Sequence, residues 1–257
     1  MIETHHGGIR LLQFESLRGI DGLVHAVTTR PQNYAPHRGQ GREQAVDARR
    51  RVCEVLGLDF DKLTSPQQVH GAEVIPVETG DIGCGRDGRE TAVRFVDGLV
   101  CDKPGVPLIS LSADCPLVVA YDPRRPAIGV VHSSWQGTVA RSTEQMIRVM
   151  QQVYGSDPAM LLAAIAPSAG PCCYEVGEEV RRIAQTRLKD ADAFFPRRDG
   201  RMTFDLWAAN RQQLIECGIP AENIEVAGLC SICDTRFWSH RRDGADAGRT
   251  ALFIALR

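Results

Sequence analysis

The amino-acid sequence predicts a mixed α/β fold. Short apolar runs with the length of buried strands alternate along the chain with stretches that place apolar residues at helical spacing. Of the 257 residues, 43% are hydrophobic and 24% are charged, which is too apolar for a disordered protein and sufficient for a sizeable core. No internal repeat, low-complexity segment or change of composition marks a linker, so we expect one domain over residues 1–257.

The N-terminal half contains one expected helix among several strands. Apolar residues recur at helical spacing over Arg42–Leu56, and Gly57 follows as a stop signal. The Gly- and charge-rich stretch Gly80–Glu90 predicts an exposed loop. The turn Asp122–Pro126 between two apolar runs indicates a hairpin. The expected strands are Leu23–Thr29, Val69–Val77, Gly98–Cys101, Val106–Ser112, Pro116–Tyr121 and Ala127–His132.

The C-terminal half contains three expected helices. Thr138–Tyr154 is the clearest amphipathic stretch, and Gly155 follows it. A second helix is expected over Glu178–Leu188, and a third over Asp205–Cys217, where the first residue suits an N-cap. The expected strands are Met160–Ala166, Ile224–Ala227 and Thr250–Ala255.

Charge, apolar patterning and cysteine count limit the possible partners. The chain has 30 basic and 32 acidic residues, so its net charge of −2 does not favour nucleic-acid binding. The first eight residues lack a basic segment followed by an apolar one, and no apolar run approaches the roughly 18–20 residues that span a bilayer. Nine cysteines are an odd number, which favours reduced thiols over a disulfide framework. We therefore expect a cytoplasmic protein, a monomer or small homo-oligomer, that binds neither nucleic acid nor membrane.

The strongest chemical candidates are His70, Cys115 and His132, which lie where expected strands end. Cys115 and His132 flank two strands and a turn, so a hairpin would bring them side by side. One thiolate and two imidazoles form a plausible three-ligand Zn²⁺ site with a fourth position open for water. Without metal, the same pair forms a Cys–His dyad in which His132 is the base for Cys115. A third interpretation of the same spacing has no chemical role: Cys115 is a core cysteine, and the two histidines only cap strands.

Other polar clusters carry weaker signals. Cys230 and Cys233 form a CxxC pair, but a structural zinc site needs a second pair and none lies at a suitable spacing. Adjacent Cys172 and Cys173 would point to different faces of a strand, so we do not expect them to bind a metal together. The basic segment Arg236–Arg249 suits recognition of phosphate or carboxylate, and an ordinary solvated loop explains it equally well.

Six motifs in order resemble the YfiH family, which is labelled polyphenol oxidoreductase (laccase) or peptidoglycan editing factor. The resemblance runs from about residue 64 to the C-terminal end of the sequence. The motifs are Gln67–Gly71, Ala113–Pro116 with Tyr121–Pro123, His132–Gly137, Pro167–Gly177, Phe204–Leu206 with Asn210, and Phe237–Gly244 through Arg249.

This resemblance implies a single-domain layered α-β-β-α sandwich with mixed sheets, and a zinc ion held by His70, Cys115 and His132. It also implies purine nucleoside chemistry: phosphorolysis of adenosine, inosine and methylthioadenosine, and deamination of adenosine. Its laccase label implies copper, but multicopper oxidation needs clustered pairs of histidines, and this chain has seven histidines in all.

The sequence departs from the family pattern at three places. Gln136 replaces an Arg beside the second histidine, which removes a positive charge and weighs against phosphate binding. The segment Pro31–Gly41 replaces a Gly-Gly and Ser-Leu-Asn-Leu loop, so that wall of the pocket is expected to differ. His240 stands where Tyr or Phe is usual.

The leading hypothesis is a zinc-dependent enzyme acting on purine nucleosides and phosphate. His70, Cys115 and His132 would hold the metal, and Asp114 would carry protons or support a ligand. The expected substrate-binding residues are Arg241, Arg242, Arg249 and Gln136. The alternatives are a Cys–His hydrolase that edits peptidoglycan precursors, a copper-dependent polyphenol oxidase, and a degenerate member that binds a ligand without turnover.

Overall fold

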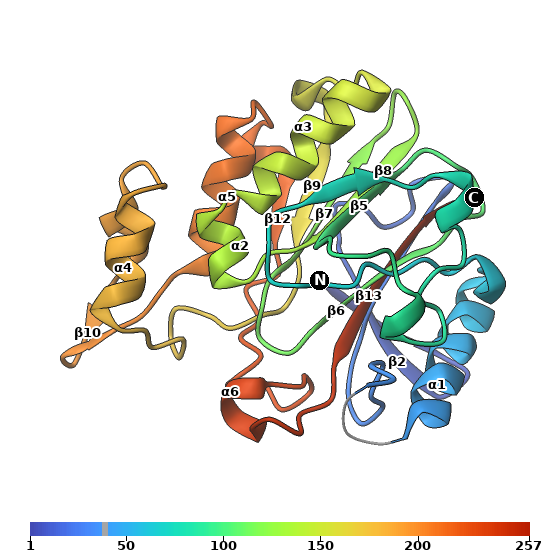
Figure 1. Ribbon diagram of the computed structural model, residues 1–257, viewed down its shortest axis with the longest axis horizontal. Coiled ribbons are helices and arrows are strands. Elements are labelled where there is room, and N and C mark those ends of the chain that lie inside the picture. Colours follow the sequence, from blue (N-terminus) through green and yellow to red (C-terminus); the bar gives the residue numbers. More distant parts are fainter. Residues whose placement is uncertain (38–40) are drawn as a thin grey trace.

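Two β-sheets pack face to face, and helices cover the outer face of each (Figure 1). This computed structural model describes residues 1–37 and 41–257. The predicted mixed α/β class and the four-layer α-β-β-α arrangement are both confirmed. Three residues of the atypical Pro31–Gly41 segment, at positions 38–40, lie outside the described residues.

The first sheet has five strands in the order β1-β2-β3-β13-β6. Neighbouring strands are antiparallel. An isolated parallel bridge joins Thr64 to Leu108, the first residue of β6. β13 lies between β3 and β6 although it is the last strand in sequence order. The strands are β1 (Ile2–His6), β2 (Ile9–Gln13), β3 (Leu23–Thr28), β6 (Leu108–Ser112) and β13 (Thr250–Leu256).

The second sheet has six strands in the order β12-β9-β7-β8-β5-β4 and mixes both orientations. β12 pairs parallel with β9, and β4 pairs parallel with β5, whereas the other neighbours are antiparallel. The strands are β4 (Val74–Pro76), β5 (Gly98–Cys101), β7 (Leu117–Asp122), β8 (Ala127–His132), β9 (Leu162–Ile165) and β12 (Ile224–Val226).

The helices are divided between the two outer faces. α1 (Arg42–Leu56) packs on the five-stranded sheet, while α3 (Ser142–Tyr154) and α5 (Leu206–Glu216) pack on the six-stranded one. α2 (Trp135–Val139) contacts both α3 and α5. The remaining elements are α4 (Glu178–Gln185), α6 (His240–Asp243) and the small hairpin of β10 (Arg197–Arg198) and β11 (Arg201–Met202).

An apolar core fills the space between the sheets. It contains Leu12, Val27, Leu252 and Ile254 from the five-stranded sheet, together with residues of β5, β7, β8 and β9 from the other. Both sheets contribute to this one interior. The expectation of one domain over residues 1–257 stays a prediction. In the part of the chain that the structure describes, no helix has the length and apolarity needed to cross a bilayer.

Several predicted elements have different limits. The expected helix Thr138–Tyr154 is two helices, because Arg141 has a left-handed backbone (φ 63°) that interrupts the hydrogen-bond ladder. The expected strand Val69–Val77 is reduced to β4. The loop Gly80–Glu90 is partly buried rather than exposed, since Arg49 donates to the carbonyls of Gly85 and Arg86.

Candidate active site

The β7–β8 hairpin places Cys115 beside His132. Leu117 pairs with His132 across the two strands, and Cys115 lies two residues before Leu117. The turn that precedes β4 brings His70 to the same place. One ligand atom from each of the three side chains lies within 4.8 Å of the other two. Three distant stretches of chain therefore converge on one point.

The turn that carries His70 is fixed by a buried carboxylate. His70 has a left-handed backbone (φ 64°), which is uncommon for a side chain with a Cβ atom. The N–H groups of Val69, His70 and Gly71 donate to the carboxylate of Asp97, at 3.0, 3.0 and 2.7 Å. These three hydrogen bonds stabilise the strained turn and hold His70 beside Cys115 and His132.

Asp97 also orients His132. Its Oδ1 atom lies 2.8 Å from Nδ1 of His132, so Nδ1 carries the proton and Nε2 is the ring nitrogen left for a metal. Asp97 is 0% exposed and His132 is 3% exposed, so this hydrogen bond is shielded from water. The sequence analysis did not single out Asp97, because no motif or spacing links it to the histidines.

The electrostatics of the site favour a thiolate at Cys115. Burial raises the pKa of the Cys115 thiol, but the adjacent His132 and His70 outweigh burial and leave this pKa at about 6. Burial lowers the pKa of His132, whereas Cys115 and Asp97 raise it, with a net value of about 9. The two groups stabilise each other as a thiolate and an imidazolium, and a bound metal ion would replace the imidazolium proton.

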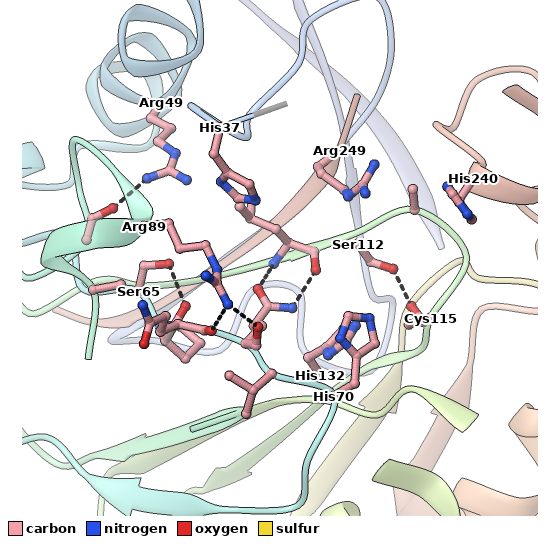
Figure 2. Close-up of a pocket in the computed structure, with 18 residues that line it drawn as sticks. His37, Arg49, Ser65, His70, Arg89, Ser112, Cys115, His132, His240 and Arg249 are labelled. Carbon is pink, nitrogen blue, oxygen red and sulfur yellow. Dashed lines mark hydrogen bonds between the residues drawn. The ribbon is translucent and has the colours of Figure 1, made fainter. Parts of the chain in front are cut away.

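The three side chains lie at the end of a cavity of about 800 Å³ (Figure 2). This volume is within the range of small-molecule sites. Five basic or titratable side chains line it besides the three candidate ligands: His37, Arg49, Arg89, His240 and Arg249. Figure 2 shows His37 and Arg249 above His70 and His132 in this view, and Arg89 to their left.

The three arginines that line the cavity differ in burial and in their hydrogen bonds. Arg49 is buried and donates to the carbonyls of Tyr34, Gly85 and Arg86, so it supports the wall. Arg89 is exposed and donates to the carbonyls of Gln67 and Gln68, next to His70. Arg249 donates through one terminal nitrogen to two nearby carbonyls.

Of the four residues expected to bind substrate, only Arg249 lines this cavity. The Arg242 guanidinium donates to the carbonyls of Ser231, Ile232, Asp234 and Phe237. Arg241 lies over the ring of Tyr174, with its guanidinium carbon 5.0 Å from the ring centre, and donates to the carbonyl of Glu175. Gln136 is exposed on α2. The geometry therefore gives Arg241 and Arg242 a structural use and leaves Gln136 outside the cavity.

Asp114, which we expected to carry protons or to support a metal ligand, connects neighbouring segments of the chain through its carboxylate. Its carboxylate accepts from the Ser231 hydroxyl at 2.7 Å and from the Arg241 N–H at 2.7 Å. Asp114 does not line the cavity, and it has a left-handed backbone (φ 95°). It links the segment that carries Cys115 to the loop at Ser231 and to α6.

The donor set at the floor of the cavity fits a zinc ion. Two imidazoles and a cysteine with a lowered pKa supply three ligands of the types that Zn²⁺ prefers, and the cavity leaves a side open. Two histidines and one cysteine also occur in blue-copper centres, which add a weak axial ligand such as Met. Among residues 1–37 and 41–257, this is the one histidine-containing group with three convergent ligands, which weighs against a multicopper mechanism.

Comparisons with known proteins agree with this architecture. The family described as multi-copper polyphenol oxidoreductase laccase matches residues 21–257. The purine nucleoside phosphorylase YlmD of Geobacillus stearothermophilus is 34% identical over 260 residues, covering 100% of this chain and 89% of that protein. The adenosine deaminase RL5 of an unknown prokaryotic organism is 32% identical, covering 94% and 97%.

A solved structure shows the same fold. The hypothetical protein YfiH of Bacillus licheniformis superposes with a TM-score of 0.89 at 30% identity, covering 97% of this chain and 96% of the other. The matched span, the identities and the superposition all agree with the six motifs. The chain therefore belongs to the multi-copper polyphenol oxidoreductase laccase family, which is the YfiH family that those motifs resemble.

Proposed function

We propose that this protein is a zinc-dependent enzyme of purine nucleosides that deaminates adenosine and cleaves adenosine, inosine and methylthioadenosine with phosphate. The observation that carries the proposal is the convergence of His70, Cys115 and His132 at the end of a nucleoside-sized cavity. Relatives named purine nucleoside phosphorylase and adenosine deaminase support the substrate class.

His70, Cys115 and His132 would hold the metal ion through two ring nitrogens and one sulfur. Zinc bound to such ligands supplies an activated water as a nucleophile near neutral pH. The chain itself contributes orientation: Asp97 holds the His132 ring and the His70 turn in one geometry. Because Asp97 accepts from both elements, one carboxylate fixes the His132 ring and the backbone that carries His70.

Phosphate and the ribose end of the substrate need positive charge and hydrogen-bond donors. Arg89 and Arg249, together with His37 and His240, supply these on the walls of the cavity. We assign anion binding to this set and no longer to Arg241, Arg242 or Gln136, which lie outside the cavity. The replacement at Gln136 therefore leaves phosphorolysis possible.

The test is incubation of purified protein with adenosine, with and without phosphate, followed by chromatography of the products. We expect inosine in both reactions and a free purine base only with phosphate. His132→Ala and Cys115→Ala should each lose the zinc ion of this site and at least about 100-fold in turnover, because each removes one of three ligands. His6→Ala, which removes an exposed histidine on β1, is the matched control and should keep both.

Zinc-loaded wild-type protein that yields neither inosine nor a free base would overturn the proposal. Retention of full zinc content by Cys115→Ala would separately disprove the ligand assignment.

A thiol hydrolase is the second candidate, and one observation favours it. Cys115, His132 and Asp97 stand in the order of a nucleophile, its base and the carboxylate that orients the base. A metal-independent hydrolase of a peptidoglycan precursor would keep its activity in chelator and lose it on alkylation of Cys115. The zinc enzyme would lose activity in chelator and regain it with zinc.

A further inference from the structure

Four cysteines from two loops gather at a second place in the molecule. Cys172 and Cys173 lie in the turn between β9 and α4, and Cys230 and Cys233 lie in the loop after β12. Their four sulfur atoms all lie within 4.8 Å of one another. The sequence analysis found no second cysteine pair at a suitable spacing for Cys230 and Cys233, and it did not expect Cys172 and Cys173 to bind a metal together. Spacing alone misses the cluster because the folded chain brings two loops together that lie about 60 residues apart.

We propose that Cys172, Cys173, Cys230 and Cys233 bind one structural zinc ion, separate from the metal centre at His70, Cys115 and His132. Four cysteine sulfurs are the closed ligand set of structural zinc sites. With Zn–S bonds of about 2.3 Å, a tetrahedral site separates its sulfurs by about 3.8 Å. The sulfur of Cys233 lies 3.5 Å from that of Cys172 and 3.1 Å from that of Cys173, so small adjustments suffice.

The backbone around Cys230 is arranged to stabilise a thiolate. The Gly170 N–H donates to the Cys230 sulfur at 3.3 Å, and the N–H groups of Ile232 and Cys233 also point to it. Hydrogen bonds from backbone N–H groups stabilise the charged form of a thiol, which is the form that binds zinc.

Metal binding would change the charge of this cluster. Binding forms four Zn–S bonds and releases the thiol protons to solvent, so the complete site carries a net charge of −2. The Arg242 guanidinium fixes the loop of the second cysteine pair by donating to the carbonyls of Ser231 and Ile232, and it also pairs with Asp243.

The ion would connect the two loops that form the back of the active site. Ser231, between the two cysteines of the second loop, donates to Asp114, the neighbour of Cys115. The two loops also meet through the bridge between Ser168 and Cys230 and through the hydrogen bond from Gly170 to the Cys230 sulfur. A zinc ion here is closed to substrate, and its role is to stabilise these loops.

The test is zinc content per chain, measured by mass spectrometry of protein purified under reducing conditions. We expect about two zinc ions in the wild type and about one each in Cys233→Ser and Cys115→Ala. Cys217→Ser, a partly buried cysteine at the end of α5, is the matched control and should keep both ions.

X-ray absorption at the zinc edge of Cys115→Ala provides a second measurement that needs no change in the cluster. We expect a shell of sulfur neighbours alone at about 2.3 Å. Wild-type protein with about one zinc ion that Cys115→Ala loses and Cys233→Ser keeps would overturn the proposal. A disulfide between Cys233 and either Cys172 or Cys173 in the purified protein, or iron in place of zinc, would overturn it as well.

Discussion

At the residue scale, the carboxylate of Asp97 holds two of the three candidate metal ligands in place. One oxygen of its carboxylate accepts from the His132 ring, and both oxygens accept from the backbone around His70. Removing its negative charge would therefore disturb two ligands at once. Burial raises the pKa of Asp97, but the hydrogen bonds from His132 and from backbone N–H groups outweigh it and lower the pKa overall.

Asp97→Asn should reduce the zinc affinity of the active site by about 10- to 100-fold, because an amide holds the His132 tautomer less firmly than a carboxylate does. Competition with a chromogenic chelator measures this affinity. Asp157→Asn, which alters an exposed carboxylate that accepts from one backbone N–H, is the control and should leave it unchanged. Equal zinc affinity in Asp97→Asn and wild type would show that Asp97 does not support the ligands.

The sequence identified all three convergent side chains but not this carboxylate. His70, Cys115 and His132 end or begin apolar runs, so the hairpin rule alone brings two of them together. Asp97 lies 35 residues before His132, and nothing in its local sequence distinguishes it from an ordinary surface aspartate. Its role depends on burial and on the path of the turn at His70, which are properties of the folded chain.

At the element scale, α2 packs directly on the turn that carries His70. A methyl group added at Gly137 would lie 2.8 Å from the carbonyl oxygen of Gly71, the residue after His70. The Ser134 hydroxyl caps the same helix by accepting from the Gly137 N–H. The close approach of the two backbones therefore depends on the absence of a side chain at Gly137.

Gly137→Ala should lower the free energy of unfolding by about 1–3 kcal/mol and weaken zinc binding, because the methyl group must push the His70 turn away. Chemical denaturation and the chelator competition measure the two effects. Gly80→Ala, where the added methyl group meets no atom within 4 Å and the backbone φ is not positive, is the matched control and should change neither. Unchanged zinc affinity in Gly137→Ala would mean that α2 does not position His70.

The sequence predicted most elements of the interior and fewer at the edges. β8 has the limits that its apolar run predicts, and so does α1. The hairpin of β1 and β2 was missed because its burial alternates weakly and its turn, at Gly7 and Gly8, follows two polar histidines. The break at Arg141 was also missed, since this residue pairs with Glu144 and Glu216, and these partners are visible only in the folded protein.

At the scale of the whole molecule, one buried histidine links stability to pH. His25 on β3 is 1% exposed, and its Nε2 accepts from the Phe14 N–H at 2.9 Å. Burial lowers the pKa of His25 to about 4, despite the attraction of Glu225. The folded protein therefore keeps His25 neutral under conditions in which the unfolded chain protonates it.

The contribution of His25 to stability should be complete above pH 6.5 and should decrease as the pH falls to about 4. Between these values only the unfolded chain gains the proton, and the total loss is about 3 kcal/mol. Urea unfolding at several pH values should show this slope in the wild type and a flatter one in His25→Gln, which retains an acceptor for Phe14. The candidate metal ligands are the same in both proteins, so their titration contributes equally to both curves. Parallel curves of unfolding free energy against pH would therefore contradict the assignment of this slope to His25.

The position of β13 has a consequence for the order of synthesis. A ribosome produces β3 and β6 long before β13, yet in the finished sheet β13 separates them and pairs with both. The five-stranded sheet cannot close until β13 has left the exit tunnel, and the nascent chain exposes two unpaired strand edges until then. Chaperones that shield such edges should therefore bind this polypeptide until β13 emerges.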